Sequence, residues 1–247
     1  MNTIKGIVLK ERNTGDNGKF IDILTAEHGM IELTVRGSRK INSSLLNSTQ
    51  LFAYSDFCYH ESDKYKVLTS AVPVRIFYKL RESLTGISLA CYMAEVLKYC
   101  SETQGNEILR LFLNVLHFLE NGLRDEKMLK AIFEFRLMAD TGFMPDVVMC
   151  RECGAYEPEE LYFSIRESCF YCVGCFKFNP AEWYKINISV LSAMRHIVLT
   201  DFERLFNFRT SENTMNTLEY LSEKYLTAKL ERSFRTLDFY KSIRKTI

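Results

Sequence analysis

The residues best suited to chemistry in this 247-residue chain are cysteines, five of which lie between Cys150 and Cys175. Cys150 and Cys153 form one C-x-x-C pair, and eighteen residues further on Cys172 and Cys175 form a second pair. A separation of roughly 15 to 20 residues is typical of four-cysteine zinc sites. Each pair can wrap a tight turn that directs both thiolates at one ion, and two pairs complete a tetrahedron. The spacing therefore predicts a zinc site.

The fifth cysteine leaves the choice of ligands open. Cys169 forms another C-x-x-C pair with Cys172, fifteen residues after Cys153. A redox-active pair and plain buried cysteines are the alternatives to a metal. A disulfide framework is not expected, because the chain starts with charges around a short apolar run and shows no signal-peptide cleavage site, which predicts a reducing cytosolic environment. The other three cysteines lie in apolar surroundings and are expected in the core: Cys58, Cys91 and Cys100.

Catalysis by this zinc is not expected. A catalytic zinc keeps one position open and usually has His or carboxylate ligands. Of four histidines only His196 lies within thirty residues of the cysteine pairs, and no H-E-x-x-H motif occurs. The site is therefore predicted to be closed and structural, with a zinc enzyme as the less favoured alternative. The chain also lacks a G-x-x-x-x-G-K-[ST] motif and a compact acidic motif, so we expect no enzyme activity.

The first eighty residues predict a small β-barrel. Short apolar or alternating segments are separated by turn clusters, and the segments are 4–12, 20–24, 31–35, 52–60 and 66–72. About five short strands in this length suit a closed barrel such as an OB-fold. A β-sandwich is the competing shape.

After Pro73 the pattern changes to that of helices. Apolar residues recur at three- and four-residue steps, which predicts helices in 80–97, 108–118, 128–136, 188–198 and 214–227. Asp125 is expected to cap the third helix. We therefore predict an α+β fold with an N-terminal OB-fold barrel at 1–80. A mainly helical domain at 81–247 follows and carries a zinc-binding insertion at about 146–180.

Composition is that of a soluble globular protein, with 47% hydrophobic and 26% charged residues. No apolar run approaches the roughly 18 residues that a membrane span requires, so no membrane association is expected. The net charge of +1 conceals +3 over residues 1–80, −6 over 81–184 and +4 over 185–247. Two basic regions therefore flank an acidic middle.

The densest basic stretch of the barrel half contains Arg36, Arg39 and Lys40, where a predicted strand runs into a polar loop. From such a position basic side chains can reach a phosphate backbone, although a solvated loop is the plain alternative. Four further cations are expected to extend a DNA-binding path: Lys5, Lys10, Arg12 and Lys19. The aromatic residues Phe52, Tyr54 and Tyr59 are candidates for base stacking, with about half of them expected in the core because of strand alternation.

Several segments carry a family resemblance when they are taken in order. In the N-terminal part they are GIVLK at 6–10, LTAEHG at 24–29 and VRGSRK at 35–40. FEFRLMADTGFMPD at 133–146 is the most specific, and it leads into the first cysteine pair, after which YFS at 162–164 precedes the second. With these segments the chain resembles, over essentially its whole length, the RecO family of bacterial recombination mediators.

The resemblance implies a non-enzymatic protein that binds single- and double-stranded DNA and anneals complementary strands. Such proteins act with RecR to load RecA onto strands coated by single-strand-binding protein, in the cytoplasm at the nucleoid. It also implies about one structural zinc per chain, with Cys150, Cys153, Cys172 and Cys175 as ligands. Ser168 and Cys169 stand where zinc-bearing relatives have two glycines, which is a departure from the family pattern and leaves Cys169 as a spare thiol.

The family picture also includes an acidic tail of single-strand-binding protein that ends in an apolar residue. Such a tail needs an apolar groove with basic residues at its rim. The basic last third of the chain supplies candidates for this rim: Arg195, Arg204, Arg209, Lys224 and Lys229. The alternative function is a zinc-ribbon module that binds only proteins and has no intrinsic affinity for DNA.

Overall fold

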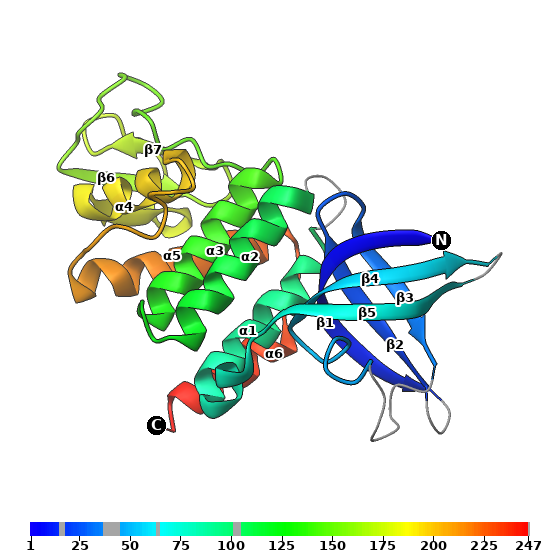
Figure 1. The fold of residues 1–247 in the computed structure, drawn as a ribbon. Coiled ribbons are helices and arrows are strands. Elements are labelled where there is room, and N and C mark those ends of the chain that lie inside the picture. Colours follow the sequence, from blue (N-terminus) through cyan, green and yellow to red (C-terminus); the bar gives the residue numbers. More distant parts are fainter. Residues whose placement is uncertain (15–17, 37–44, 63–64, 101–104, 247) are drawn as a thin grey trace. The chain divides into compact units, whose positions relative to one another are not determined.

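A computed structural model describes residues 1–14, 18–36, 45–62, 65–100 and 105–246. The chain divides into two compact units (Figure 1). The first consists of Met1–Leu123 together with Phe234–Ile247, and the second is Arg124–Ser233. We refer to them as the barrel unit and the zinc-segment unit. Arg39 and Lys40, two of the predicted DNA-binding residues, lie outside the described residues.

Five strands in the barrel unit form a closed barrel in the order β1-β2-β3-β5-β4. Neighbouring strands are antiparallel except β3 and β5, which pair in parallel through Thr34 and Val67. The prediction of a small OB-like barrel is confirmed, and the β-sandwich alternative is excluded. The strands are β1 (Asn2–Thr14), β2 (Gly18–Thr25), β3 (Gly29–Val35), β4 (Ala53–Glu61) and β5 (Lys66–Ile76).

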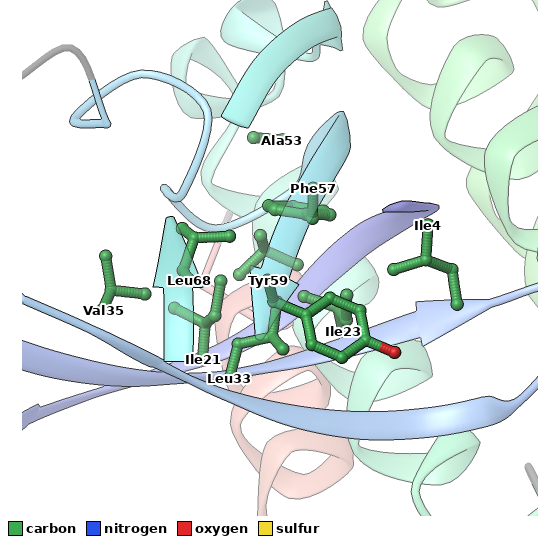
Figure 2. Packing of buried hydrophobic residues seen from close by; sticks show 10 residues of the cluster. Ile4, Ile21, Ile23, Leu33, Val35, Ala53, Phe57, Tyr59 and Leu68 are labelled. Carbon is green, nitrogen blue, oxygen red and sulfur yellow. The ribbon is translucent and has the colours of Figure 1, made fainter. Parts of the chain in front are cut away.

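Alternation along these strands fills the barrel interior. On β2, Ile21 and Ile23 are fully buried, and Leu33 and Val35 on β3 and Phe57 on β4 join them (Figure 2). The period of two that predicted half-buried strands is the period at which these side chains point inward. The strands are therefore held together by a contiguous apolar core.

Three helices complete the barrel unit, namely α1 (Leu84–Leu97), α2 (Gly105–Glu120) and α6 (Arg235–Arg244), with a short 3₁₀ helix, η1 (Tyr78–Glu82). The rings of Phe52 and Phe112 on α2 lie 6.0 Å apart, and those of Tyr92 on α1 and Phe234 lie 5.8 Å apart. The change from strands to helices falls between β5 and η1, near the predicted boundary at residue 80. The division into compact units differs from this boundary, because it places α1, α2 and α6 in the same unit as the strands. The division into domains at 1–80 and 81–247 stays a prediction.

The zinc-segment unit combines three helices with a small antiparallel sheet in the order β7-β6-β8. The helices are α3 (Glu126–Asp140), α4 (Ile188–Leu199) and α5 (Glu212–Lys229). The strands are β6 (Glu160–Ser164), β7 (Cys169–Cys172) and β8 (Tyr184–Asn187), and a 3₁₀ turn, η2 (Pro180–Glu182), precedes β8. Asp125 caps α3 by accepting hydrogen bonds from the amides of Lys127 and Met128, as predicted.

Contacts between α3 and α5 include a buried charge network. Lys130 is fully buried, with its ammonium 2.8 Å from Glu134 and 3.0 Å from Glu223. Ser222 donates a 2.6 Å hydrogen bond to Glu134, which satisfies the buried carboxylate further. Among the helices of the described residues, none combines the length and the apolar character needed to cross a membrane.

Candidate metal centre and nucleic-acid interface

The two predicted cysteine pairs converge on one point. The sulfur atoms of Cys150, Cys153, Cys172 and Cys175 all lie within 4.8 Å of one another, and those of Cys153 and Cys172 are 3.7 Å apart. Tetrahedral zinc with Zn–S bonds of about 2.3 Å requires sulfur atoms roughly 3.8 Å apart. The α+β fold with a four-cysteine cluster is therefore confirmed, and the cluster is compatible with a structural zinc site that leaves no coordination position open.

The backbone turns of both pairs direct the thiols inward. The Gly154 amide donates to the Cys150 carbonyl at 2.9 Å, and Gly154 has φ +72°, a conformation that glycine adopts without strain. In the second pair the amide of Cys175 donates to the carbonyl of Cys172 at 3.0 Å. Gly154 thus relieves the first turn, whereas Gly174, inside the second pair, does not have a positive φ.

Ionisation of the four thiols also points to a cation. Burial acts to raise the pKa of Cys150, but hydrogen bonds from the backbone amides of Cys153 and Cys172 lower it to about 6. Hydrogen bonding with the thiols of Cys153 and Cys172 raises the pKa of Cys175 to about 12. Four thiols at this separation therefore do not all ionise by themselves, whereas a divalent ion among them stabilises the thiolates that bind it.

Cys169 lies outside the cluster that the described residues form. It is 1% exposed, and its sulfur accepts a 3.4 Å hydrogen bond from the guanidinium of Arg151. The neighbouring Ser168, which stands at a family glycine position, has φ +56°. The chain therefore keeps a left-handed backbone at this turn although it has lost the glycine.

Arg195 on α4 has a different position from the one that we predicted. It is 8% exposed, so it is not available at a basic rim. Its guanidinium donates to the carbonyls of Val147 (2.6 Å), Val148 (2.7 Å) and Tyr156 (2.5 Å) and lies over the Tyr156 ring. These acceptors precede and follow the first cysteine pair, so Arg195 fixes both ends of the first metal-binding turn.

The predicted barrel cations divide into exposed and occupied groups. Arg36, directly after β3, is exposed, as are Lys5 and Lys10 on β1. Lys5 lies 3.6 Å from Asp56, and both side chains of this pair remain about half exposed. Arg36 and Lys10 are therefore exposed to solvent, and Lys5 is exposed beside a carboxylate.

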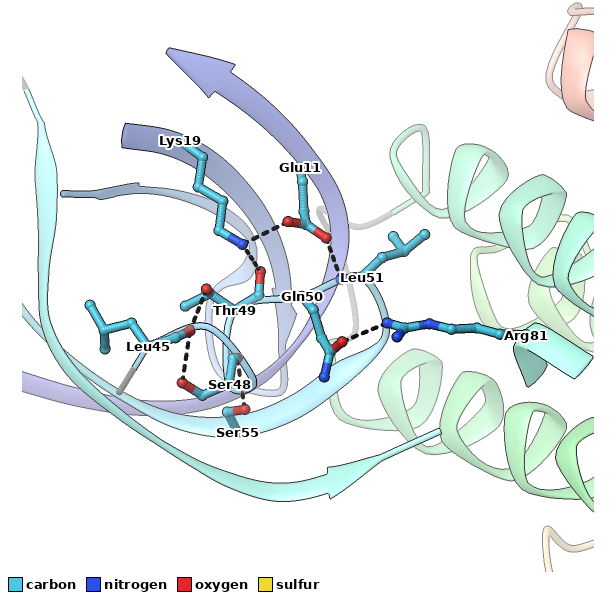
Figure 3. Close-up of polar contacts among 9 residues, drawn as sticks. All are labelled: Glu11, Lys19, Leu45, Ser48, Thr49, Gln50, Leu51, Ser55 and Arg81. Atoms are coloured by element: carbon cyan, nitrogen blue, oxygen red, sulfur yellow. Dashed lines mark hydrogen bonds and ion pairs between the residues drawn. The ribbon is translucent and has the colours of Figure 1, made fainter. Parts of the chain in front are cut away.

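Lys19 and Arg12 have protein partners instead. Lys19 is 4% exposed, and its ammonium lies 2.6 Å from Glu11 and donates to the Thr49 carbonyl at 2.7 Å (Figure 3). This cation anchors the segment that enters β4, so its ammonium does not face solvent as the predicted DNA-binding path requires. The guanidinium of Arg12 pairs with both Asp22 and Glu32 and is only half exposed.

Two of the three predicted stacking aromatics belong to the core. Phe52 is 2% and Tyr59 4% exposed, whereas Tyr54 is half-buried. Of the other tail-binding candidates, Arg204, Arg209 and Lys224 are exposed and Lys229 is half-buried. Arg209 lines a pocket of about 500 Å³ with Ile188 and Phe208.

Sequence reasoning missed an aromatic cluster beside the metal centre. It contains Tyr162, Tyr171, Phe176, Phe178 and Trp183, each of which has a ring within 6 Å of another member. The signal was the density of aromatic residues between the second cysteine pair and β8. We call this group the aromatic cluster.

The chain combines a closed five-stranded barrel with a second unit that holds a zinc-compatible centre, and the barrel defines a protein of the OB-fold class. Family models described as "Recombination protein O N terminal" and "Recombination protein O C terminal" match residues 1–77 and 81–238. The DNA repair protein RecO of Acetivibrio thermocellus is 31% identical over 98% of both chains. That of Bacillus subtilis is 29% identical over 90% of this chain and 86% of its own. The chain belongs to the RecO family, which supports a role in DNA repair and recombination that includes DNA binding.

Proposed function

We propose that this protein is a DNA-binding recombination mediator without catalytic activity. In this proposal it binds single- and double-stranded DNA, anneals complementary strands and acts with RecR to load RecA onto strands coated by single-strand-binding protein. It would do so in the cytoplasm, at the nucleoid. The observation that carries the proposal is the closed OB-like barrel in a chain that the RecO family models cover from residue 1 to 238.

DNA contact is assigned to the barrel. Arg36 is exposed at the end of β3, three residues before Arg39 in the sequence, and Lys5 and Lys10 add exposed positive charge on β1. Annealing needs no bond-making chemistry, because cations that neutralise the phosphates of two strands lower their repulsion, and base pairing then supplies the driving force. Contacts of this kind bind DNA with little regard to sequence.

The metal has a structural role in this proposal. Cys150, Cys153, Cys172 and Cys175 would hold one zinc ion per chain, and four thiolates leave no site for a water or a substrate. Zinc would supply folding energy to a segment of short strands and turns. The chain's own residues prepare that site through the two backbone turns and through Arg195.

Capture of single-strand-binding protein is assigned to the zinc-segment unit. The pocket beside Arg209 has apolar walls from Ile188, Ala193 and Phe208, which suits an acidic tail that ends in an apolar residue. Arg209→Glu should weaken binding of a tail peptide, whereas Lys177→Glu, a change of another exposed cation of this unit, should not. A peptide that binds both variants equally would place the contact elsewhere.

The central test is a triple change of Arg36, Arg39 and Lys40 to Glu, with zinc content and helical signal checked first. We expect DNA affinity to fall at least tenfold, annealing to be lost and the salt dependence of binding to decrease, by roughly one in slope for each phosphate contact removed. The matched control reverses three exposed cations outside the proposed path: Lys79, Arg235 and Lys245.

Two outcomes would contradict the proposal. A folded triple variant that binds and anneals DNA like the parent would exclude the barrel loop as the contact. A parent protein that fails to bind DNA at low salt would favour the zinc-ribbon module that binds only proteins.

A further inference from the structure

A groove of about 1160 Å³ lies in the zinc-segment unit, apart from the four thiols. One wall consists of aromatic-cluster residues, among them Tyr171, Phe178 and Trp183, and the other is the end of α5 with Lys224 and Lys229. The proposed barrel contact does not use any of these residues. The groove therefore needs an explanation of its own.

The aromatic wall is partly exposed, with Phe178 at the surface and Tyr171 and Trp183 half-buried. The rings of Phe178 and Trp183 stack at 5.1 Å with an interplanar angle of 16°, and Tyr171 lies 5.1 Å from Phe178 and 5.5 Å from Trp183. Phe178 is 48% exposed, although it lies among other aromatic rings. An exposed group of large aromatic side chains around a cavity is characteristic of a binding site.

The charges around the groove favour an anionic ligand, but only slightly. Four cations line it, namely Arg151, Arg166, Lys224 and Lys229, against the three carboxylates Glu167, Glu182 and Glu231. The Arg166 guanidinium lies 3.8 Å from Glu167, Lys229 donates to the Arg166 carbonyl at 3.1 Å, and Arg151 donates to the Cys169 sulfur at 3.4 Å. Charge can therefore orient a ligand here, whereas the aromatic surface must supply most of the affinity.

We infer that this groove binds single-stranded DNA, with bases stacked on Phe178 and Trp183 and the backbone following Lys224 and Lys229. Every base has a π-face, so stacking on an aromatic surface tolerates any sequence, and each stacked base contributes about 1–3 kcal/mol. Bases in a duplex are already stacked and paired, so the groove selects single strands. It is a second strand-binding surface, in the unit that does not contain the barrel.

The two surfaces differ in their expected response to salt. Arg36, Arg39 and Lys40 lie within five positions of the sequence, so salt should weaken their contact with DNA strongly. The groove has nearly balanced charge, so its contact should depend on salt only weakly. A protein with both surfaces can hold one strand by its phosphates and another by its bases, which suits strand annealing.

Trp183, the single tryptophan of the chain, makes the groove directly observable. Titration of the full-length, zinc-loaded protein with oligothymidylate should quench Trp183 fluorescence to saturation, because a base that stacks on the indole quenches its emission. A duplex of equal length should quench it much less. Phe178→Ala should weaken the quenching titration about tenfold. The control Phe239→Ala removes a phenylalanine on α6 that is 57% exposed and should leave it unchanged.

The triple barrel variant separates this inference from the proposed function. If the groove binds DNA but the barrel contact is wrong, the triple barrel variant binds DNA like the parent and shows the same quenching of Trp183. Phe178→Ala should then weaken the quenching in both proteins. The inference is overturned if bound oligothymidylate leaves Trp183 emission unchanged, if Phe178→Ala has no effect, or if quenching disappears in the folded barrel variant. An acidic peptide that quenches Trp183 and is not displaced by oligothymidylate would identify the groove as a peptide site.

Discussion

The barrel and the zinc segment obtain order by different means. In the barrel, strands of 7 to 13 residues enclose a contiguous core in which Ile21, Leu33 and Phe57 have no exposed surface. In the zinc segment the strands have only 4 or 5 residues, and the turns between them depend on a thiol cluster and on the buried guanidinium of Arg195. A segment with little apolar core of its own is thus the part of the chain that polar anchors, and a metal bound by the four thiols, would stabilise most.

Aromatic residues show the same contrast. In the barrel Phe57 and Tyr59 point into the core, as Figure 2 shows, and they contribute to stability. In the zinc segment Phe178 remains half exposed beside Trp183. Aromatic side chains that a small segment cannot bury are available for binding. Burial of the barrel aromatics therefore serves stability, whereas exposure of Phe178 suits the binding role that we infer for it.

Loss of a metal ligand should have the largest effect and should be confined to one region. Structural zinc contributes roughly 10–16 kcal/mol of apparent binding energy, so Cys172→Ser should release the metal and unfold the segment around β6 and β7. The barrel should stay folded. Zinc content and limited proteolysis measure both effects. The control Cys169→Ser should retain zinc, and a Cys169→Ser variant that loses zinc while Cys175→Ser retains it would show that the ligand set is wrong.

Phe57→Ala should produce the converse result. Removal of this fully buried ring from the barrel core should cost about 3–5 kcal/mol, while zinc content stays at one ion per chain. Hydrogen exchange of the β2 and β4 amides, followed with increasing urea, measures the loss. Release of zinc by this substitution would show that the two regions do not obtain stability independently.

Arg195→Ala should have a smaller effect, again in the zinc segment. Three carbonyls around the first cysteine pair lose a charged donor, which we expect to cost about 2–3 kcal/mol. Competition with a chelator should then show zinc affinity lower by about 30- to 100-fold. Arg204→Ala on the exposed surface is the control and should change neither quantity. Equal zinc affinity for Arg195→Ala and the parent would mean that the turn forms without this anchor.

Ser168→Gly should have the smallest effect and the opposite sign. A left-handed backbone costs a non-glycine residue about 1–2 kcal/mol, and a glycine at this position would remove that cost. Glycine also has greater freedom in the unfolded chain, which offsets part of the stability gained. Since Ser168 has φ +56°, the variant should be about 0.5 kcal/mol more stable, as measured by thermal unfolding. A destabilised variant would indicate that the serine side chain has a role at this turn.

Local patterns accounted for most of what the sequence predicted. Alternation located the barrel strands, the C-x-x-C spacing located the metal-binding segment, and Asp125 marked the start of α3. These signals lie within a few residues of the structures that they predict. The choice of Cys175 over Cys169 came from the family resemblance and not from the spacing.

Predictions failed where a side chain meets partners far away in the sequence. The ammonium of Lys19 pairs with Glu11 and donates to the carbonyl of Thr49, thirty residues away. The guanidinium of Arg195 donates to carbonyls 39 to 48 residues away. Both lysine and arginine are usually exposed, so a single sequence gives no sign of their burial. The groove was missed for the same reason, because its walls come from β7, η2 and α5.

The return of α6 to the barrel unit has a consequence for the order in which the protein matures on the ribosome. Phe234, Leu237 and Tyr240 pack in the first unit but are translated after the whole of Arg124–Ser233. During synthesis the inserted unit can therefore complete its fold and take up metal while Tyr92 on α1 still lacks Phe234 as a partner. The unit whose synthesis begins first is thus the last to complete its fold. Until α6 has been translated, the apolar surface that α6 covers stays exposed and can associate with the wrong partner.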